Sequence, residues 1–174
     1  MSRYLCVLKR ILRSSINTSR TLAITLAMIG LSCGSIPLYA ADVYWDTDTS
    51  AVGNMTDGTL IGGTGTWDDA GTSNWWDGVA GVLQTWVNGN NDNAIFSGPY
   101  STTVGFVGIP SLNTVTLSGG ITAGQLSFHR SGYTVTGSTL TLAGADPTID
   151  VYVGESATIS SIIAGSGGLR VTGG

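Results

Sequence analysis

The chain has 174 residues with seven Lys and Arg and eleven Asp and Glu, but five of the seven cations lie in the first twenty residues. The segment after Ala40 carries a net charge of −9, from two cations and eleven acids, and contains neither Lys nor Cys. This composition excludes a disulfide framework, a Cys-ligated metal site and a thiol nucleophile, and without a basic patch no nucleic-acid partner is expected.

Residues 1–40 have the three parts of a secretory signal peptide. A basic segment precedes the apolar run 21–31, TLAITLAMIGL, and small residues follow up to Ala40, which is the pattern of export with cleavage after Ala40. This apolar run is too short for a membrane-spanning helix, which needs about 20 residues. Lipidation at Cys33 is a disfavoured alternative, because Leu31 stands one place from its position in a lipobox.

Residues 41–110 form a Trp/Asp-rich region that holds all five tryptophans and eight of the eleven acids. We favour a cap, in which large aromatic side chains cover the core that the first coil of a solenoid leaves open at its end. The alternative is a sugar platform of exposed indoles. Its candidate glycan contacts are Trp75, Trp76 and Trp86.

No catalytic or metal-binding constellation emerges from the acidic residues. Glycosidases need two carboxyls facing one bond, whereas Asp68 and Asp69, as neighbours in a strand, would point to opposite faces. Asp46 and Asp48 would share a face, but nothing else marks a cleft. Calcium takes six to eight oxygen ligands, and the Asn-rich segment 88–95 has one carboxylate, which favours a solvated turn. The sequence predicts no catalytic residues, no metal and no cofactor, and a local turn held by Asp69.

Residues 111–174 alternate apolar and polar side chains, which predicts half-buried strands separated by glycines. His129 follows Phe128, and the alternation predicts an outward-facing surface residue rather than a catalytic base. The expected strands contain residues 115–117, 126–128, 133–135, 140–142, 149–153 and 169–171.

Short strands of this kind fit two all-β architectures, a parallel β-solenoid or an antiparallel β-sandwich. VTLSGG at 115–120 is echoed by LTLAGA at 140–145 and VTGG at 171–174. The spacing between successive echoes would suit one solenoid coil, so we favour a solenoid that begins within residues 111–174.

The end of the chain, IIAGSGGLRVTGG at 162–174, resembles the bacterial proteins with autotransporter-associated β-strand repeats, whose repeat opens with Gly-Ser-Gly-Gly-Leu. Segments 120–128, 132–137 and 140–142, and the order of Trp-Asp and aromatic motifs from Tyr44 to Phe96, are also similar to that family. Arg170 and Val171 depart from the family's usual Thr-Lys pair. The resemblance implies a right-handed parallel β-helical stalk, exported to the surface or outer membrane of a Gram-negative-type cell, and no catalytic residues.

The resemblance also implies that the chain is the amino-terminal fragment of a longer passenger-like protein. We therefore expect a structural, non-enzymatic segment whose partners are downstream solenoid repeats of the same protein. Two other functions stay open: a glycan-binding adhesin module that contacts surface polysaccharide, and the first part of a polysaccharide-degrading β-helix enzyme. An uncovered strand edge also predicts that the isolated segment self-associates.

Overall fold

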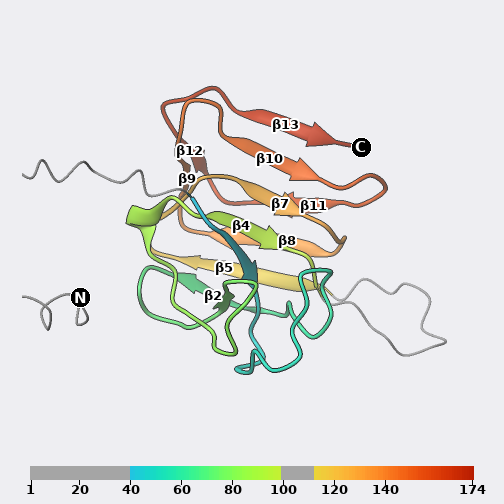
Figure 1. The fold of residues 1–174 in the computed structure, drawn as a ribbon. Helices are drawn as coiled ribbons and strands as arrows, with labels where there is room; N and C mark the ends of the chain where they lie inside the picture. Colours follow the sequence, from blue (N-terminus) through green and yellow to red (C-terminus); the bar gives the residue numbers. More distant parts are fainter. Residues whose placement is uncertain (1–39, 99–111) are drawn as a thin grey trace, which may run out of the picture. The chain divides into compact units, whose positions relative to one another are not determined.

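The computed structural model describes residues 40–98 and 112–174 (Figure 1). Within these ranges the chain is built of β-strands and one short 3₁₀ helix, η1 (Asn88–Asn90), and no helix there is long and apolar enough to cross a membrane. The expected signal peptide lies outside the described residues, except for its last residue. The strands are β1 (Asp42–Trp45), β2 (Gly65–Asp68), β3 (Trp75–Trp76), β4 (Asn93–Phe96), β5 (Asn113–Ser118), β6 (Ile121–Ala123), β7 (Leu126–Phe128), β8 (Tyr133–Gly137), β9 (Leu140–Leu142), β10 (Thr148–Val151), β11 (Ala157–Ile159), β12 (Ile163–Ala164) and β13 (Arg170–Gly173).

The strands form three sheets that the chain enters in a fixed order. The first sheet runs β13-β10-β7-β4-β1-β3, the second β11-β8-β5-β2, and the third β12-β9-β6. From β5 onward each successive strand enters the second, third and first sheet in turn, and then repeats the cycle. The first and second sheets each contain strands from both described ranges, whereas the third sheet contains only strands from residues 112–174 (Figure 1).

Neighbouring strands pair in parallel throughout the described sheets, except for the antiparallel pair β1–β3. The predicted all-β class is confirmed, and the antiparallel sandwich is wrong for these strands. From β5 onward the turns between strands are rich in glycine and too short to hold a helix. These turns bring the chain back to the same sheet, where each strand pairs with the strand of the previous cycle. In the first sheet Leu126 is the register partner of Ile149, and Ile149 is the partner of Val171, so the last two cycles use nearly equal lengths of chain.

The repeat that the sequence suggested is wrong, because its three echoes lie in different sheets. Residues 115–118 belong to β5 in the second sheet, 140–142 to β9 in the third, and 171–173 to β13 in the first. All three segments share an alternating strand with a glycine at its end or within two residues after it, where the chain turns. The three similar segments therefore share a local strand-and-turn geometry and do not pair with one another. The register partner of Val115 is Val135, in the next strand of the second sheet.

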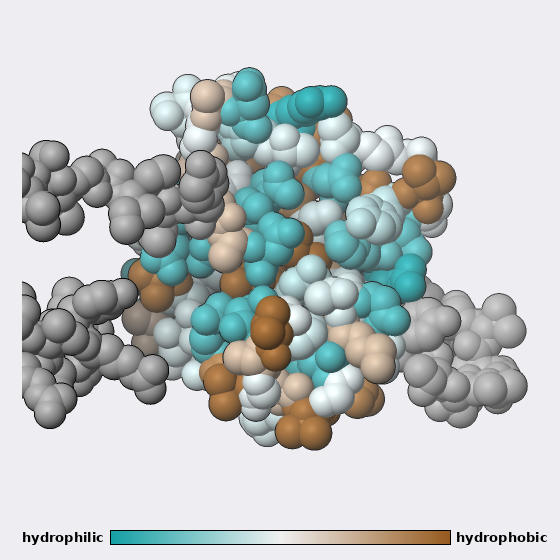
Figure 2. Space-filling view, viewed as in Figure 1, coloured by the Kyte–Doolittle hydropathy of each residue, from teal (hydrophilic) through white to brown (hydrophobic). Residues whose placement is uncertain are grey.

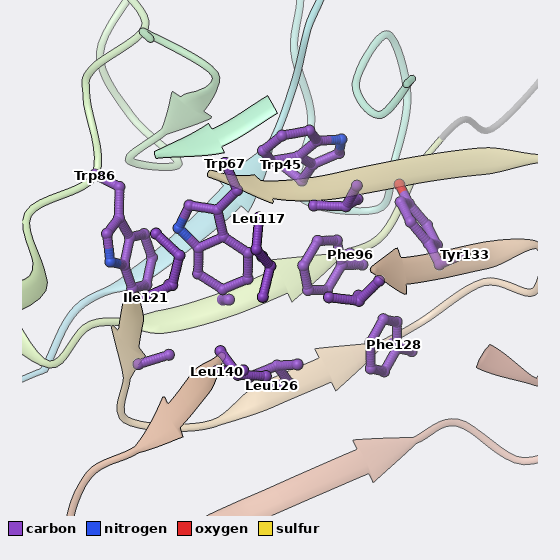
Figure 3. Close-up of a cluster of buried hydrophobic side chains, with 14 of the residues drawn as sticks. Trp45, Trp67, Trp86, Phe96, Leu117, Ile121, Leu126, Phe128, Tyr133 and Leu140 are labelled. Atoms are coloured by element: carbon purple, nitrogen blue, oxygen red, sulfur yellow. The ribbon is translucent and has the colours of Figure 1, made fainter. Parts of the chain in front are cut away.

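The core lies between the three sheets and is built from rows of side chains that repeat from strand to strand (Figure 3). Alternate residues of a strand face one side, and parallel register then stacks equivalent residues in rows. Phe96 and Phe128 are register partners whose rings stack at 4.8 Å and 12°. Tyr133 packs beside both rings, and its hydroxyl donates a hydrogen bond to the Gly98 carbonyl.

Candidate functional site

All five tryptophans are buried. Trp45, Trp67, Trp75, Trp76 and Trp86 are 0, 0, 1, 5 and 2% exposed. The rings of Trp67 and Trp75, and those of Trp67 and Trp86, meet edge to face with centroids 4.8 Å apart in both pairs. Such contacts suit the aromatic quadrupole. Four of the indoles, those of Trp45, Trp67, Trp75 and Trp86, form an aromatic part of the main core next to Phe96 (Figure 3).

The three candidate glycan contacts do not form a common exposed platform. Trp75 and Trp86 belong to the main core, whereas Trp76 packs in a smaller cluster with Ala51 and Ile61. The Trp76 indole N–H donates to the Ala80 carbonyl at 2.7 Å. The three rings are buried, so they do not supply the exposed indoles that the alternative sugar platform requires. The alternation carried no signal that two adjacent tryptophans would both be covered, by the core on one side and by the loop 77–84 on the other.

The acidic residues serve turns and do not converge on one point. Asp46 is buried; its Oδ2 accepts from Asn54 Nδ2 at 2.6 Å and its Oδ1 from the Asp48 N–H at 3.2 Å. Burial raises the pKa of the Asp46 carboxyl, and the Asn54 hydrogen bond opposes that rise. Asp48 instead accepts from the Ser50 N–H, so Asp46 and Asp48 do not face a shared substrate position.

The second acidic pair also separates into two structural roles. Asp68 accepts hydrogen bonds from both the N–H and the hydroxyl of Thr72, at 2.7 and 2.8 Å, so Asp68 holds the turn that the sequence assigned to Asp69. Asp69 accepts from the Asn88 N–H at 3.0 Å. Its role is to tie the turn after β2 to η1. No group of three or more His, Cys, Asp or Glu side chains within the described ranges could hold a metal ion.

His129 lines a surface hollow of about 370 Å³ beside β10. Its ring stacks on Tyr152 at 3.9 Å, and its Nε2 lies 3.1 Å from the Ser127 hydroxyl. Arg130 and Glu155 also line this hollow and form an ion pair at 3.7 Å. Burial lowers the pKa of the His129 imidazole. The residue is half-buried where the sequence predicted an outward surface position, because Tyr152 from the next cycle covers it.

The side of the sheets that ends in β13 and β12 leaves aliphatic side chains uncovered. Val171 continues the row of Leu126 and Ile149, yet it is 67% exposed. Ile163 continues the row of Ile121 and Leu140 and is 38% exposed. A second hollow of about 240 Å³ lies there, lined by Leu142, Pro147, Ile163, Ala164, Gly165, Gly167 and Leu169.

The opposite end of the unit carries exposed aliphatic residues on loops. Figure 2 shows hydrophobic residues gathered at its lower end, over the loops farthest from β13, while hydrophilic residues cover much of the middle. The loops that follow β1 and β3 contain such side chains at Val52, Met55, Leu60, Val79 and Val82.

Comparison with known proteins adds one relative. No protein-family model matches the chain, and no solved structure matches it. The chain is 39% identical over 160 residues to a protein named "Adhesin BmaC autotransporter" from Brucella suis biovar 1 (strain 1330). The alignment covers 89% of this chain and 4% of that protein. Along most of its length the chain is thus similar to a small part of an autotransporter adhesin.

Proposed function

We propose that this chain is the amino-terminal, non-catalytic structural segment of an exported autotransporter-like protein at the cell surface or outer membrane of a Gram-negative-type cell. In this proposal residues 41–110 are a Trp-rich cap, and residues 111–174 begin a right-handed parallel β-solenoid. Because the relative is named an adhesin, adhesion is the activity to examine in a longer protein that contains this segment.

The observation that carries the proposal is the cyclic order of the strands. Each strand from β5 onward enters the next of three sheets, and each pairs in parallel with the strand one cycle earlier. Parallel crossovers are right-handed in nearly all proteins. Each cycle buries a row of side chains on the previous one, so the arrangement extends by adding cycles without a larger globular core.

The uncovered rows at Val171 and Ile163 support a further coil as the natural partner of this edge. Their counterparts one cycle earlier, Ile149 and Leu140, are buried. Burying an aliphatic side chain contributes about 1.5–3 kcal/mol, so a following repeat of the same polypeptide would gain that energy at each row.

Spin labels test the coil arrangement. Thr114, Thr134 and Thr158 are successive register partners in the second sheet. Labels at Thr134 and Thr158, one strand spacing of about 4.8 Å apart at the backbone, should broaden each other's spectra strongly. The control pair, Thr134 with Thr141 of the third sheet, should broaden less. Equal broadening in both pairs would contradict the proposed coils.

Epitope accessibility tests the location independently. Val79 is 90% exposed, so a short epitope inserted after it should be recognised by antibody on intact cells that express the parent protein. The same epitope fused to a cytoplasmic protein is the control. Recognition only after permeabilisation would refute surface exposure while leaving the coil test unaffected.

A further inference from the structure

The outer edge of β6 lies where a strand from an earlier cycle would pair. β9 occupies the other side of β6, where the Ile121 N–H donates to the Thr139 carbonyl. A parallel strand added at the outer edge would place one residue beside Ile121, and that residue would donate its N–H to the Gly120 carbonyl and accept the Thr122 N–H. These two backbone groups define an open position for strand addition.

The side chain of Asn88 already makes both of these hydrogen bonds. Its Nδ2 donates to the Gly120 carbonyl at 2.9 Å, and its Oδ1 accepts from the Thr122 N–H at 2.7 Å. A carboxamide carries the same donor and acceptor as a peptide group. Asn88 therefore reproduces, with one side chain, the hydrogen bonds of a parallel bridge.

Neighbouring residues satisfy the rest of this edge and hold Asn88 in place. The buried Trp86 indole donates to the Thr122 carbonyl at 3.1 Å and to Asn88 Oδ1 at 3.2 Å. The Gly124 N–H donates to the Asp92 carbonyl at 2.8 Å. The other end of the third sheet differs, because β12 has no further strand beside it in the described chain and its Ile163 side chain is partly exposed.

We propose that Asn88 closes the β6 edge to strand addition by a second copy of the chain, so that copies can add to the third sheet only at β12. The excluded partner is the β12 edge of another copy, which would otherwise pair head to tail with β6 and continue without end. The closure of the β6 edge does not depend on whether further coils follow Gly174, whereas addition at β12 requires that β12 is the last strand of the third sheet, as it is in the described chain.

Hydrogen exchange on the 174-residue chain tests the closure directly. Asn88→Ala should speed exchange of the Thr122 amide by about tenfold, because its acceptor is removed. Asn88→Asp keeps the acceptor and should leave that amide protected. Asn90→Ala is the matched control, since the Asn90 side chain donates to Asp92 and not to β6. Unchanged exchange in Asn88→Ala would overturn the proposal.

Sedimentation velocity tests the consequence for association. Asn88→Ala should form species that grow with concentration beyond the size reached by the parent chain and by Asn90→Ala. Adding Ile163→Lys to the same chain should abolish this growth, because a charge at β12 disfavours edge pairing. A size distribution for Asn88→Ala equal to that of the parent, or growth that survives Ile163→Lys, would also overturn the proposal.

Discussion

At the scale of single residues, hydrogen bonding distinguishes indoles that are equally buried. Trp45 and Trp67 are both inaccessible to solvent. The Trp45 indole N–H donates to the Gly63 carbonyl at 2.8 Å, whereas the Trp67 indole N–H has no hydrogen-bond partner. An unpaired buried donor costs free energy that a paired one does not, so the two side chains contribute differently to stability despite equal burial.

Substituting each of these tryptophans by Phe should separate the two contributions. Both changes remove similar volume and leave a cavity, but Trp45→Phe also breaks a hydrogen bond and leaves the Gly63 carbonyl unpaired. We expect Trp45→Phe to lower the free energy of unfolding by about 1 kcal/mol more than Trp67→Phe. Urea unfolding followed by circular dichroism measures the difference. A larger loss of unfolding free energy in Trp67→Phe would contradict a stabilising role for the Trp45 hydrogen bond.

His129 predicts a pH dependence of stability. Burial lowers the pKa of its imidazole in the folded chain, so the unfolded chain binds the proton more readily. The stability from neutral His129 is present above the unfolded pKa of about 6.5 and is lost as pH falls through the lower folded pKa. When the pH is lowered from 7 to 5, the melting temperature of His129→Gln should therefore fall less than that of the parent. Parallel curves for both proteins would exclude His129 as the cause.

At the scale of elements, close backbone approach between strands depends on glycine at the end of β8. Gly137 has φ of 101°, and a Cβ there would lie 2.6 Å from the Leu117 carbonyl oxygen of β5. Both strain and contact oppose any other residue. The register of β8 on β5 therefore depends on the absence of a side chain at this position.

Gly137→Ala should destabilise the chain by more than about 1 kcal/mol. Gly120→Ala is the matched control, because nothing lies within 4 Å of its added Cβ, and it should change stability by less than about 0.5 kcal/mol. Thermal unfolding of the two variants beside the parent gives the comparison. Equal losses of stability in the two variants would mean that the close approach of β5 and β8 does not require glycine at this position.

The strands also show which parts of the fold can be predicted from alternation in the sequence. Alternation located β5, β7, β8 and β9, because each carries apolar residues at every second position. It missed β6, β11 and β12, each of which contains an alanine, a residue that is depleted in strands and weakens the pattern. Segment 88–95 was expected to be a solvated turn; the role of Asn88 needs a partner in β6, far along the chain, and local spacing carries no signal for such a contact.

At the scale of the whole unit, the two ends differ in what they offer to another molecule. The tryptophan cluster and the β1–β3 pair cover one end, while β13 leaves an edge with exposed Val171 at the other. Unpaired strand edges template association. Self-association of the isolated segment, expected from the sequence, therefore stays a prediction tied to this edge.

Val171→Lys should weaken that self-association. The side chain is 67% exposed, so the change costs little folding energy, whereas a charge on an edge strand opposes pairing with a second copy. Val79→Lys adds the same charge at a more exposed loop position and serves as control. Light scattering over a concentration series should give a smaller average mass for Val171→Lys only; equal masses for both variants would place the contact elsewhere.

The length of chain between register partners is uneven, and this bears on evolution and engineering. Val43 and Ala94 are partners although β2, β3 and η1 lie between them in the sequence, whereas only β6 and β7 separate Val115 from its partner Val135. Both pairs are nevertheless parallel, Val43 with Ala94 in the first sheet and Val115 with Val135 in the second. The additional residues of the longer connection include loops outside the sheets, and the length of these loops does not change how the strands pair. The entropic penalty of lengthening such a loop rises only slowly. Foreign peptides grafted into these loops would be held away from the sheets by a scaffold that need not change.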